Sequence, residues 1–189
     1  EAMYSKVRFP VSLSRGAYWS GRAAEAAADA DGANRWYRIA AQHTTNFYGQ
    51  MAADKLPRLE RPPLPPESLP GAADVKAFEA RELVLLARRL DHLGASKTLK
   101  RVMRHMARAA DSKFDHILLA RLARDLDRPQ YAVYAARIAI KKGHLLTESG
   151  YPVLPSRNRA LPLSITMAII RQESAFDREA ISHAGARGL

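Results

Sequence analysis

The residues best suited to chemistry lie at the end of the sequence, in AIIRQESAFDREAISHAGARGL, residues 168–189. Glu173 is an isolated acid in an apolar segment, and a turn and a glycine-rich stretch follow it. A carboxyl group among apolar side chains loses hydration, which favours its protonated form. Because a general acid must carry a proton, Glu173 is the candidate catalytic residue.

The segment that begins at Pro162 is predicted to form a helix that is apolar on every side. Its apolar residues are Leu163, Ile165, Met167, Ala168, Ile169 and Ile170. Such a helix is expected to be buried, and Glu173 lies one turn beyond its last apolar residues. The alternative is a glutamate at a frayed helix end, either solvated or paired with Arg171 or Arg178.

Two features after Glu173 concern the backbone. Asp177 is typical of an N-cap and predicts a short helix through Ile181. Gly185 and Gly188 allow tight turns and a close approach of the backbone to a ligand. Taken alone, these glycines also fit an ordinary loop.

Composition favours an all-α protein. The chain has 189 residues, 47% of them apolar, with many alanines and leucines and few β-branched residues. It has no cysteine and no apolar run long enough to span a bilayer, and its first residues do not resemble a signal peptide. The six histidines (His43, His92, His105, His116, His144 and His183) have no metal-ligand spacing, so no metal ion and no cofactor is expected.

Helical segments and breaks alternate along the chain. Residues 14–56 predict short helices packed through aromatic and alanine side chains, with Asp31-Gly32 as the first break. Residues 57–73 hold six of the eleven prolines and predict a connector. A PxxP docking motif is the less favoured interpretation of that segment.

Four more helices are predicted after the connector. The first runs from about Asp74 to Leu93 and ends at Gly94, and the second carries an apolar stripe from Leu99 to Ala110. The third covers about residues 112–126, and the fourth begins at Pro129 and closes at Gly143. Successive helices with alanine-rich contacts suggest an irregular α-solenoid, and residues 144–161 form a further break.

Positive charge is concentrated in these four helices. Residues 76–142 hold sixteen Lys and Arg against seven Asp and Glu, which accounts for nine of the eleven net positive charges. Lys97, Lys100, Arg101, Arg104 and Arg108 repeat on the face opposite the apolar stripe. This face is interpreted as a solvated surface that can also lie against an anionic polymer.

The C-terminal pieces together resemble the start of the catalytic domain of soluble lytic murein transglycosylases. Members of this family carry an α-superhelical region before a goose-lysozyme-like catalytic domain, and the family signature pairs Glu-Ser with a following aromatic residue. A Ser-x-x-Gly-Ala-x-Gly-Leu run follows in that signature. The matching residues here are Glu173-Ser174, Phe176 and Ser182 through Leu189. Residues 16–53 are similar, less specifically, to the end of the superhelix.

The resemblance implies a periplasmic enzyme that cleaves the bond between N-acetylmuramic acid and N-acetylglucosamine in peptidoglycan. Glu173 would act as the single acid and base, and the product would be a 1,6-anhydromuramoyl end. It also implies that five neighbouring residues shape the substrate cleft. These are Ser174, Ser182, Gly185, Arg187 and Gly188.

The resemblance also implies an order of domains. Residues 1–56 would end the superhelical domain, 57–73 would connect it to a helical linker domain at 74–150, and 151–189 would begin the catalytic domain. The family continues beyond the residue that corresponds to Leu189. We therefore expect a polypeptide of only these 189 residues to be inactive.

Two other classes of protein fit parts of the sequence. A catalytically silent α-solenoid scaffold would bind protein partners or peptidoglycan, and it would not depend on Glu173. A nucleic-acid binder would explain the charge, but no base-reading or base-stacking motif accompanies the basic residues. We therefore expect peptidoglycan as the partner, with no nucleic acid and no integral membrane segment, and the sequence names no protein partner.

Overall fold

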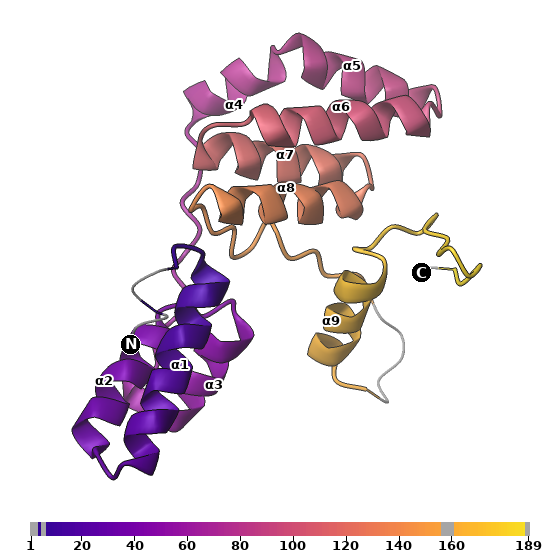
Figure 1. Cartoon of the computed structure of the whole chain (residues 1–189). Coiled ribbons are helices and arrows are strands. Elements are labelled where there is room, and N and C mark those ends of the chain that lie inside the picture. Colours follow the sequence, from indigo (N-terminus) through magenta and orange to yellow (C-terminus); the bar gives the residue numbers. More distant parts are fainter. Residues whose placement is uncertain (1–3, 5–6, 156–160, 188–189) are drawn as a thin grey trace. The chain divides into compact units, whose positions relative to one another are not determined.

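The computed structural model describes Tyr4, residues 7–155 and residues 161–187, and this part of the chain is all-α (Figure 1). It contains nine α-helices, and 3₁₀ geometry occurs at Tyr4 and at Arg58–Glu60. The only β-pairing in these residues is an isolated bridge between Ile181 and Arg187. The predicted fold class is therefore confirmed. The chain divides into two compact units, Glu1–Pro65 and Pro66–Leu189.

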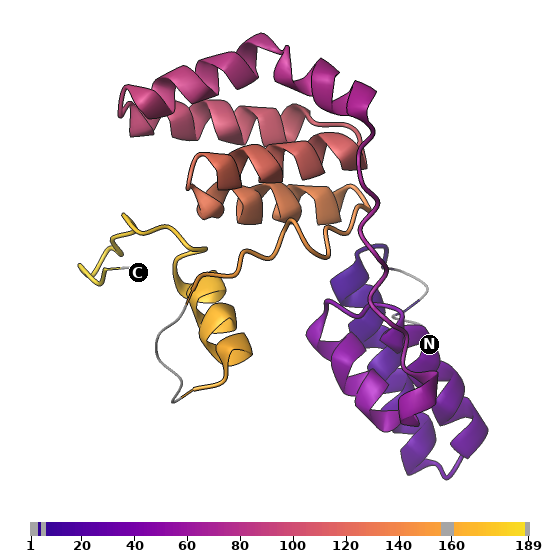
Figure 2. The ribbon, with the colours of Figure 1, turned by 180° about the vertical axis from the view of Figure 1, so that it is seen from behind.

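The first unit packs three helices against one another (Figure 2). Aromatic and alanine side chains fill the space between them. They are α1 (Pro10–Ala26), α2 (Ala30–Ala41) and α3 (Phe47–Lys55). Tyr18 is buried and lies 6.0 Å from Tyr37 and 5.6 Å from Tyr48, measured between ring centroids. Ala17 of α1 and Ala40 and Ala41 of α2 are fully buried and let these helices approach closely. Trp36, Tyr37 and Tyr48 pack between helices, as predicted, whereas Trp19 and Phe47 are 52% and 68% exposed.

The first helix break was predicted at the wrong place. Asp31 and Gly32 lie inside the first turn of α2, and the chain turns at Ala28, whose φ is 59°. The Asp29 side chain caps α2 by accepting a hydrogen bond from the Gly32 N–H at 2.8 Å. A β-carbon at Gly32 would collide with the Asp29 carboxylate, so this glycine serves a helix start and not a helix end.

The proline-rich segment is mostly extended. Arg58–Glu60 form the 3₁₀ turn η2, and residues 61–71 have no helix or strand. Glu67 is 9% exposed, and its carboxylate accepts hydrogen bonds from the backbone N–H groups of Glu148 and Ser149, both at 3.0 Å. This contact ties the connector to the loop that precedes the last helix.

The second unit begins with a stack of five helices (Figure 1). They are α4 (Ala72–Glu79), α5 (Glu82–His92), α6 (Ser96–Ala109), α7 (Lys113–Asp125) and α8 (Pro129–Lys141). Helix α8 packs against both α6 and α7, while α5 packs against α6 and α4 against α7. The core of the stack includes Phe78, Leu99, Met103, Ile117 and Leu122, each at most 2% exposed.

The single helix predicted for residues 74–93 is two helices. Ala80 ends α4, and Arg81 has extended backbone angles before α5 begins. The Arg81 guanidinium pairs with Asp115 of α7 at 2.6 Å and lies over the Phe78 ring. This tertiary contact favours a corner where the apolar periodicity alone predicts continuity.

The other helix limits agree with the sequence. Gly94 and Gly143 end their helices with φ values of 66° and 82°, in the left-handed region that glycine adopts without strain. Ser112 caps α7 by accepting from the Asp115 N–H at 3.0 Å, and Pro129 occupies the first turn of α8. No helix in the described part of the chain combines the length and the apolarity that a membrane span needs.

Candidate active site

Glu173 is the last residue of the final helix, α9 (Leu163–Glu173), and its side chain is exposed. The prediction that α9 is buried is wrong for the described chain, because none of its residues is buried and Ile165 and Ile169 are 51% and 54% exposed. An apolar helix is buried only where other elements cover it, and no described helix packs extensively against α9. The apolar surroundings expected for Glu173 are therefore not present among the described residues.

The two cations considered as partners of Glu173 are bound elsewhere. Arg171 Nη1 donates to the Gly150 carbonyl at 2.6 Å, and its guanidinium lies 4.2 Å from the centre of the Tyr151 ring. Arg178 makes two hydrogen bonds to the Asp127 carboxylate, at 2.7 and 3.3 Å. Glu173 makes no hydrogen bond or ion pair with any described residue, so the described chain agrees with the solvated form of the helix-end alternative and not with pairing to Arg171 or Arg178.

The position of Glu173 is electrostatically unfavourable for the helix. The C-terminal end of a helix carries partial negative charge, and a carboxylate there costs a few tenths to about 1 kcal/mol. The neighbouring Arg171 directs its guanidinium away from Glu173, to the 150–151 loop, where it donates to the Gly150 carbonyl. The stability of α9 therefore does not explain an acid at this position.

The turn after Glu173 has an unusual backbone. Ala175 and Phe176 have φ values of 52° and 66°, which side-chain-bearing residues rarely adopt. Phe176 is only 1% exposed, so burial of its ring holds the turn in this conformation. Ser174 lies at the start of the turn, where its hydroxyl donates to the Ile170 carbonyl at 3.3 Å.

Asp177 caps a turn and not the predicted helix. Its carboxylate accepts from the Glu179 N–H at 3.0 Å, and the Ala180 N–H donates to its carbonyl at 3.2 Å. The next residues leave the turn and enter the bridge at Ile181, so no helix follows. Pairing of Arg178 with Asp127 pulls the chain toward the α7–α8 corner instead.

Residues 181–187 form a closed loop built around Ser182. The Ser182 N–H donates to the Ala186 carbonyl at 2.8 Å, and the Ser182 hydroxyl accepts from the Ala186 N–H at 3.0 Å. Gly185 has a φ of 79° with open space where a β-carbon would point, so the conformation and not crowding requires glycine. Arg187 is exposed and pairs with Ile181 through the bridge, and Gly188 lies outside the described residues.

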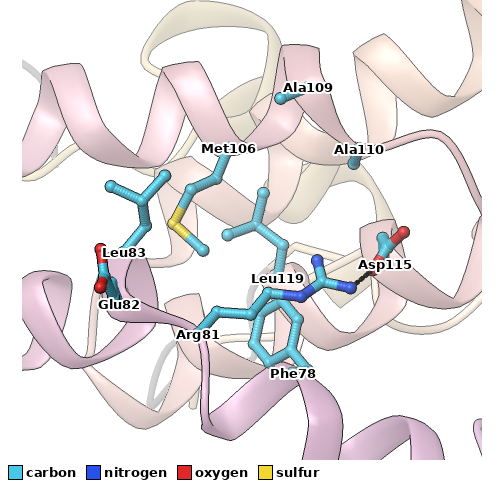
Figure 3. Close-up of a pocket in the computed structure, with 9 residues that line it drawn as sticks. All are labelled: Phe78, Arg81, Glu82, Leu83, Met106, Ala109, Ala110, Asp115 and Leu119. Atoms are coloured by element: carbon cyan, nitrogen blue, oxygen red, sulfur yellow. Dashed lines mark ion pairs between the residues drawn. The ribbon is translucent and has the colours of Figure 1, made fainter.

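An apolar cavity lies in the helical stack and not beside Glu173. It has a volume of about 330 Å³ and opens where α4 turns into α5, over Phe78, Met106 and Leu119 (Figure 3). Arg81 and Asp115, at its edge, are paired with each other. A second cavity of about 800 Å³ is lined by the 147–155 loop and Arg178, and Glu173 lines neither of them.

Within the described ranges, no group of three or more His, Asp or Glu side chains is arranged to hold a metal ion. Sequence reasoning did not find the contacts that anchor the site, namely Arg171 with Tyr151 and Arg178 with Asp127. The second joins residues 51 positions apart, and no local pattern signals such a pair.

Residues 154–189 match the family model of the Transglycosylase SLT domain. The matched segment contains α9, the turn and the closed loop, so the resemblance found in the sequence is confirmed. Comparisons with curated proteins and with solved structures found no match. Members of the SLT family are lytic transglycosylases that act on peptidoglycan, typically outside the cytoplasm, and the match supports an enzyme of this kind.

Proposed function

We propose that the protein is a periplasmic lytic transglycosylase that cleaves peptidoglycan with Glu173 as its single general acid and base. The observation that carries the proposal is the SLT match over residues 154–189, which places Glu173 in the matched segment. The geometry supports it, because the carboxylate is exposed, bound to no other described group and placed where it does not stabilise its helix.

The reaction needs only one carboxyl group. Glu173 donates its proton to the oxygen that links C1 of N-acetylmuramic acid to N-acetylglucosamine, and the C1–O bond breaks. The C6 hydroxyl of the same muramoyl residue then bonds to C1 and returns its proton to Glu173. No water is consumed, so the product is a 1,6-anhydro ring and the enzyme is a lyase.

The acids near Glu173 support a single-carboxylate mechanism. Hydrolytic glycosidases use two carboxyl groups that flank the scissile bond. Asp177 is engaged in its own turn, and Glu179 lies 3.6 Å from Arg128 on the α7–α8 corner. Neither is a free partner for Glu173.

A bound glycan strand would supply the burial that Glu173 lacks in the described chain. Ser174 and Arg187 are the neighbouring side chains that carry hydrogen-bonding groups toward such a strand. Ser182, Gly185 and Gly188 would act through the shape of the closed loop. This arrangement extends the proposed domain order, in which residues 151–189 begin a lysozyme-like domain after the helical linker at 74–150.

The test compares the protein expressed from its complete gene with its Glu173→Gln variant on purified sacculi. Glutamine keeps the size of the side chain but cannot donate or accept the catalytic proton. The matched control is Glu179→Gln, which removes one exposed carboxylate six residues away. We expect release of soluble muropeptides from the wild type and the control and loss of at least a hundredfold in Glu173→Gln.

Release that survives in Glu173→Gln would refute the catalytic assignment. Absence of release from all three proteins would instead favour the α-solenoid scaffold, which the stack of helices α4–α8 supports on its own.

A further inference from the structure

Helix α6 presents a face that carries five cations and no acid. All five are exposed, and none forms an ion pair with a described carboxylate. They are Lys97, Lys100, Arg101, Arg104 and Arg108. They extend over about 16 Å of helix at about 1.5 Å per residue. Acids three or four residues away would pair with these cations along the helix, and α6 has no acid at all.

A tyrosine from the neighbouring helix fixes two of these cations. The Arg104 guanidinium lies 4.7 Å from the centre of the Tyr134 ring, and Arg108 Nε donates to the Tyr134 hydroxyl at 3.0 Å. Although burial acts to raise it, the pKa of the Tyr134 phenol is lowered by its contacts with Arg104 and Arg108. Two long side chains are thus ordered before any ligand arrives, which reduces the entropy lost on binding.

The acid nearest this face in the sequence is paired with a lysine. Asp111, two residues after α6, pairs with Lys142 at 3.2 Å. The Lys142 ammonium also donates to the carbonyl groups of Arg108 and Ala110 and so holds the end of α6 against α8. Among the described residues the guanidinium groups of Arg104 and Arg108 contact Tyr134 and no carboxylate, so both keep donors for an external anion.

We infer that this face, the α6 basic face, is a binding surface for the carboxylates of peptidoglycan stem peptides, with Arg104 and Arg108 as its centre and Tyr134 as their positioning residue. The choice of ligand rests on the proposed function, because a glycan strand that reaches Glu173 brings peptide carboxylates with it. Guanidinium groups bind planar carboxylates through paired hydrogen bonds, which suits this ligand.

The test measures binding without cleavage. In a Glu173→Gln background, which leaves the sacculi intact, Arg104→Glu/Arg108→Glu is compared with Arg15→Glu/Arg35→Glu by co-sedimentation with sacculi. Arg15 and Arg35 are exposed on the first unit, so the control changes the net charge equally. We expect the α6 variant to lose about tenfold in affinity at low salt and the control to lose less than twofold.

Three further measurements separate the carboxylate claim from bulk charge. Sacculi whose carboxyl groups have been converted to neutral amides should bind the unaltered protein about as weakly as native sacculi bind the α6 variant. Tyr134→Phe, which changes no charge, should lose two- to threefold because Arg108 loses its acceptor. Arg104→Gln/Arg108→Gln gives the same test if the reversed charges prevent folding.

Equal losses in the α6 variant and the control would overturn the inference in favour of bulk charge. Full binding to the amidated sacculi, or unchanged binding by the α6 variant, would overturn it as well. If the wild type cleaves sacculi and the α6 variant still binds them as tightly as its parent, only this inference fails. If the α6 variant and the amidated sacculi both show weaker binding but the wild type does not cleave sacculi, only the proposed function fails.

Discussion

The turn after Glu173 stores strain that a single buried ring offsets. Ala175 and Phe176 both have left-handed backbone angles, which cost about 1–2 kcal/mol for each side-chain-bearing residue. Burying a phenylalanine side chain contributes about 1.5–3 kcal/mol. The two terms are similar in size, so the turn is held with little margin.

Phe176→Ala should therefore open this turn. Truncating a buried phenylalanine costs about 3–5 kcal/mol, and even the lower value raises the open population of the turn more than a hundredfold. The direct assay is amide hydrogen exchange at Asp177, whose N–H donates to the Ser174 carbonyl at 3.0 Å. We expect exchange at this amide to accelerate about a hundredfold.

The matched variant is Ala175→Gly, which relieves the backbone strain and leaves the ring in place. Glycine adopts left-handed angles without the steric cost, so the turn should gain about 1 kcal/mol and exchange at Asp177 should slow several-fold. Unchanged exchange in Phe176→Ala, or faster exchange in Ala175→Gly, would refute the balance of strain and burial.

Two further predictions concern groups buried in the two units. Burial lowers the pKa of His116, whose Nδ1–H donates to the Ser112 carbonyl at 2.8 Å. Neutral His116 should therefore make its full contribution to the free energy of unfolding above pH 6.5. Below this pH the free energy of unfolding should fall by up to about 1.4 kcal/mol per pH unit. Urea unfolding measured at a series of pH values should show a smaller slope in His116→Asn. Tyr37→Phe removes the hydroxyl that donates to Glu25 at 2.6 Å and should lower the midpoint of urea unfolding, whereas an unchanged midpoint would contradict the importance of this bond.

Local patterns predicted the helices well where one residue type decides the outcome. Gly94 and Gly143 end helices, Pro129 begins one, and the alternation of Leu99 and Met103 with Arg104 sets the faces of α6. Prediction failed where a contact between residues far apart in the sequence determines where a helix ends. The corner at Arg81 depends on Asp115, thirty-four residues away, and no periodicity contains that information.

The site shows the same limit. The sequence indicated a catalytic segment around Glu173, and the family match covers that segment, while the role of Glu173 stays a prediction. The expected burial was wrong because it was inferred from the composition of α9 alone, whereas burial depends on which elements cover a helix. The left-handed angles at Ala175 and Phe176 could not be predicted either, since neither residue type favours them.

The most direct test of the central claim follows the oxygen atom at the new glycan end. Sacculi are digested by the protein, expressed from its complete gene, in water enriched in oxygen-18, and the muropeptides are analysed by mass spectrometry. A lyase with Glu173 as its single acid and base gives products one water lighter than hydrolytic ones, with no heavy oxygen and none formed by Glu173→Gln. Products with a free reducing end that carries oxygen-18 would show hydrolysis and would contradict the mechanism.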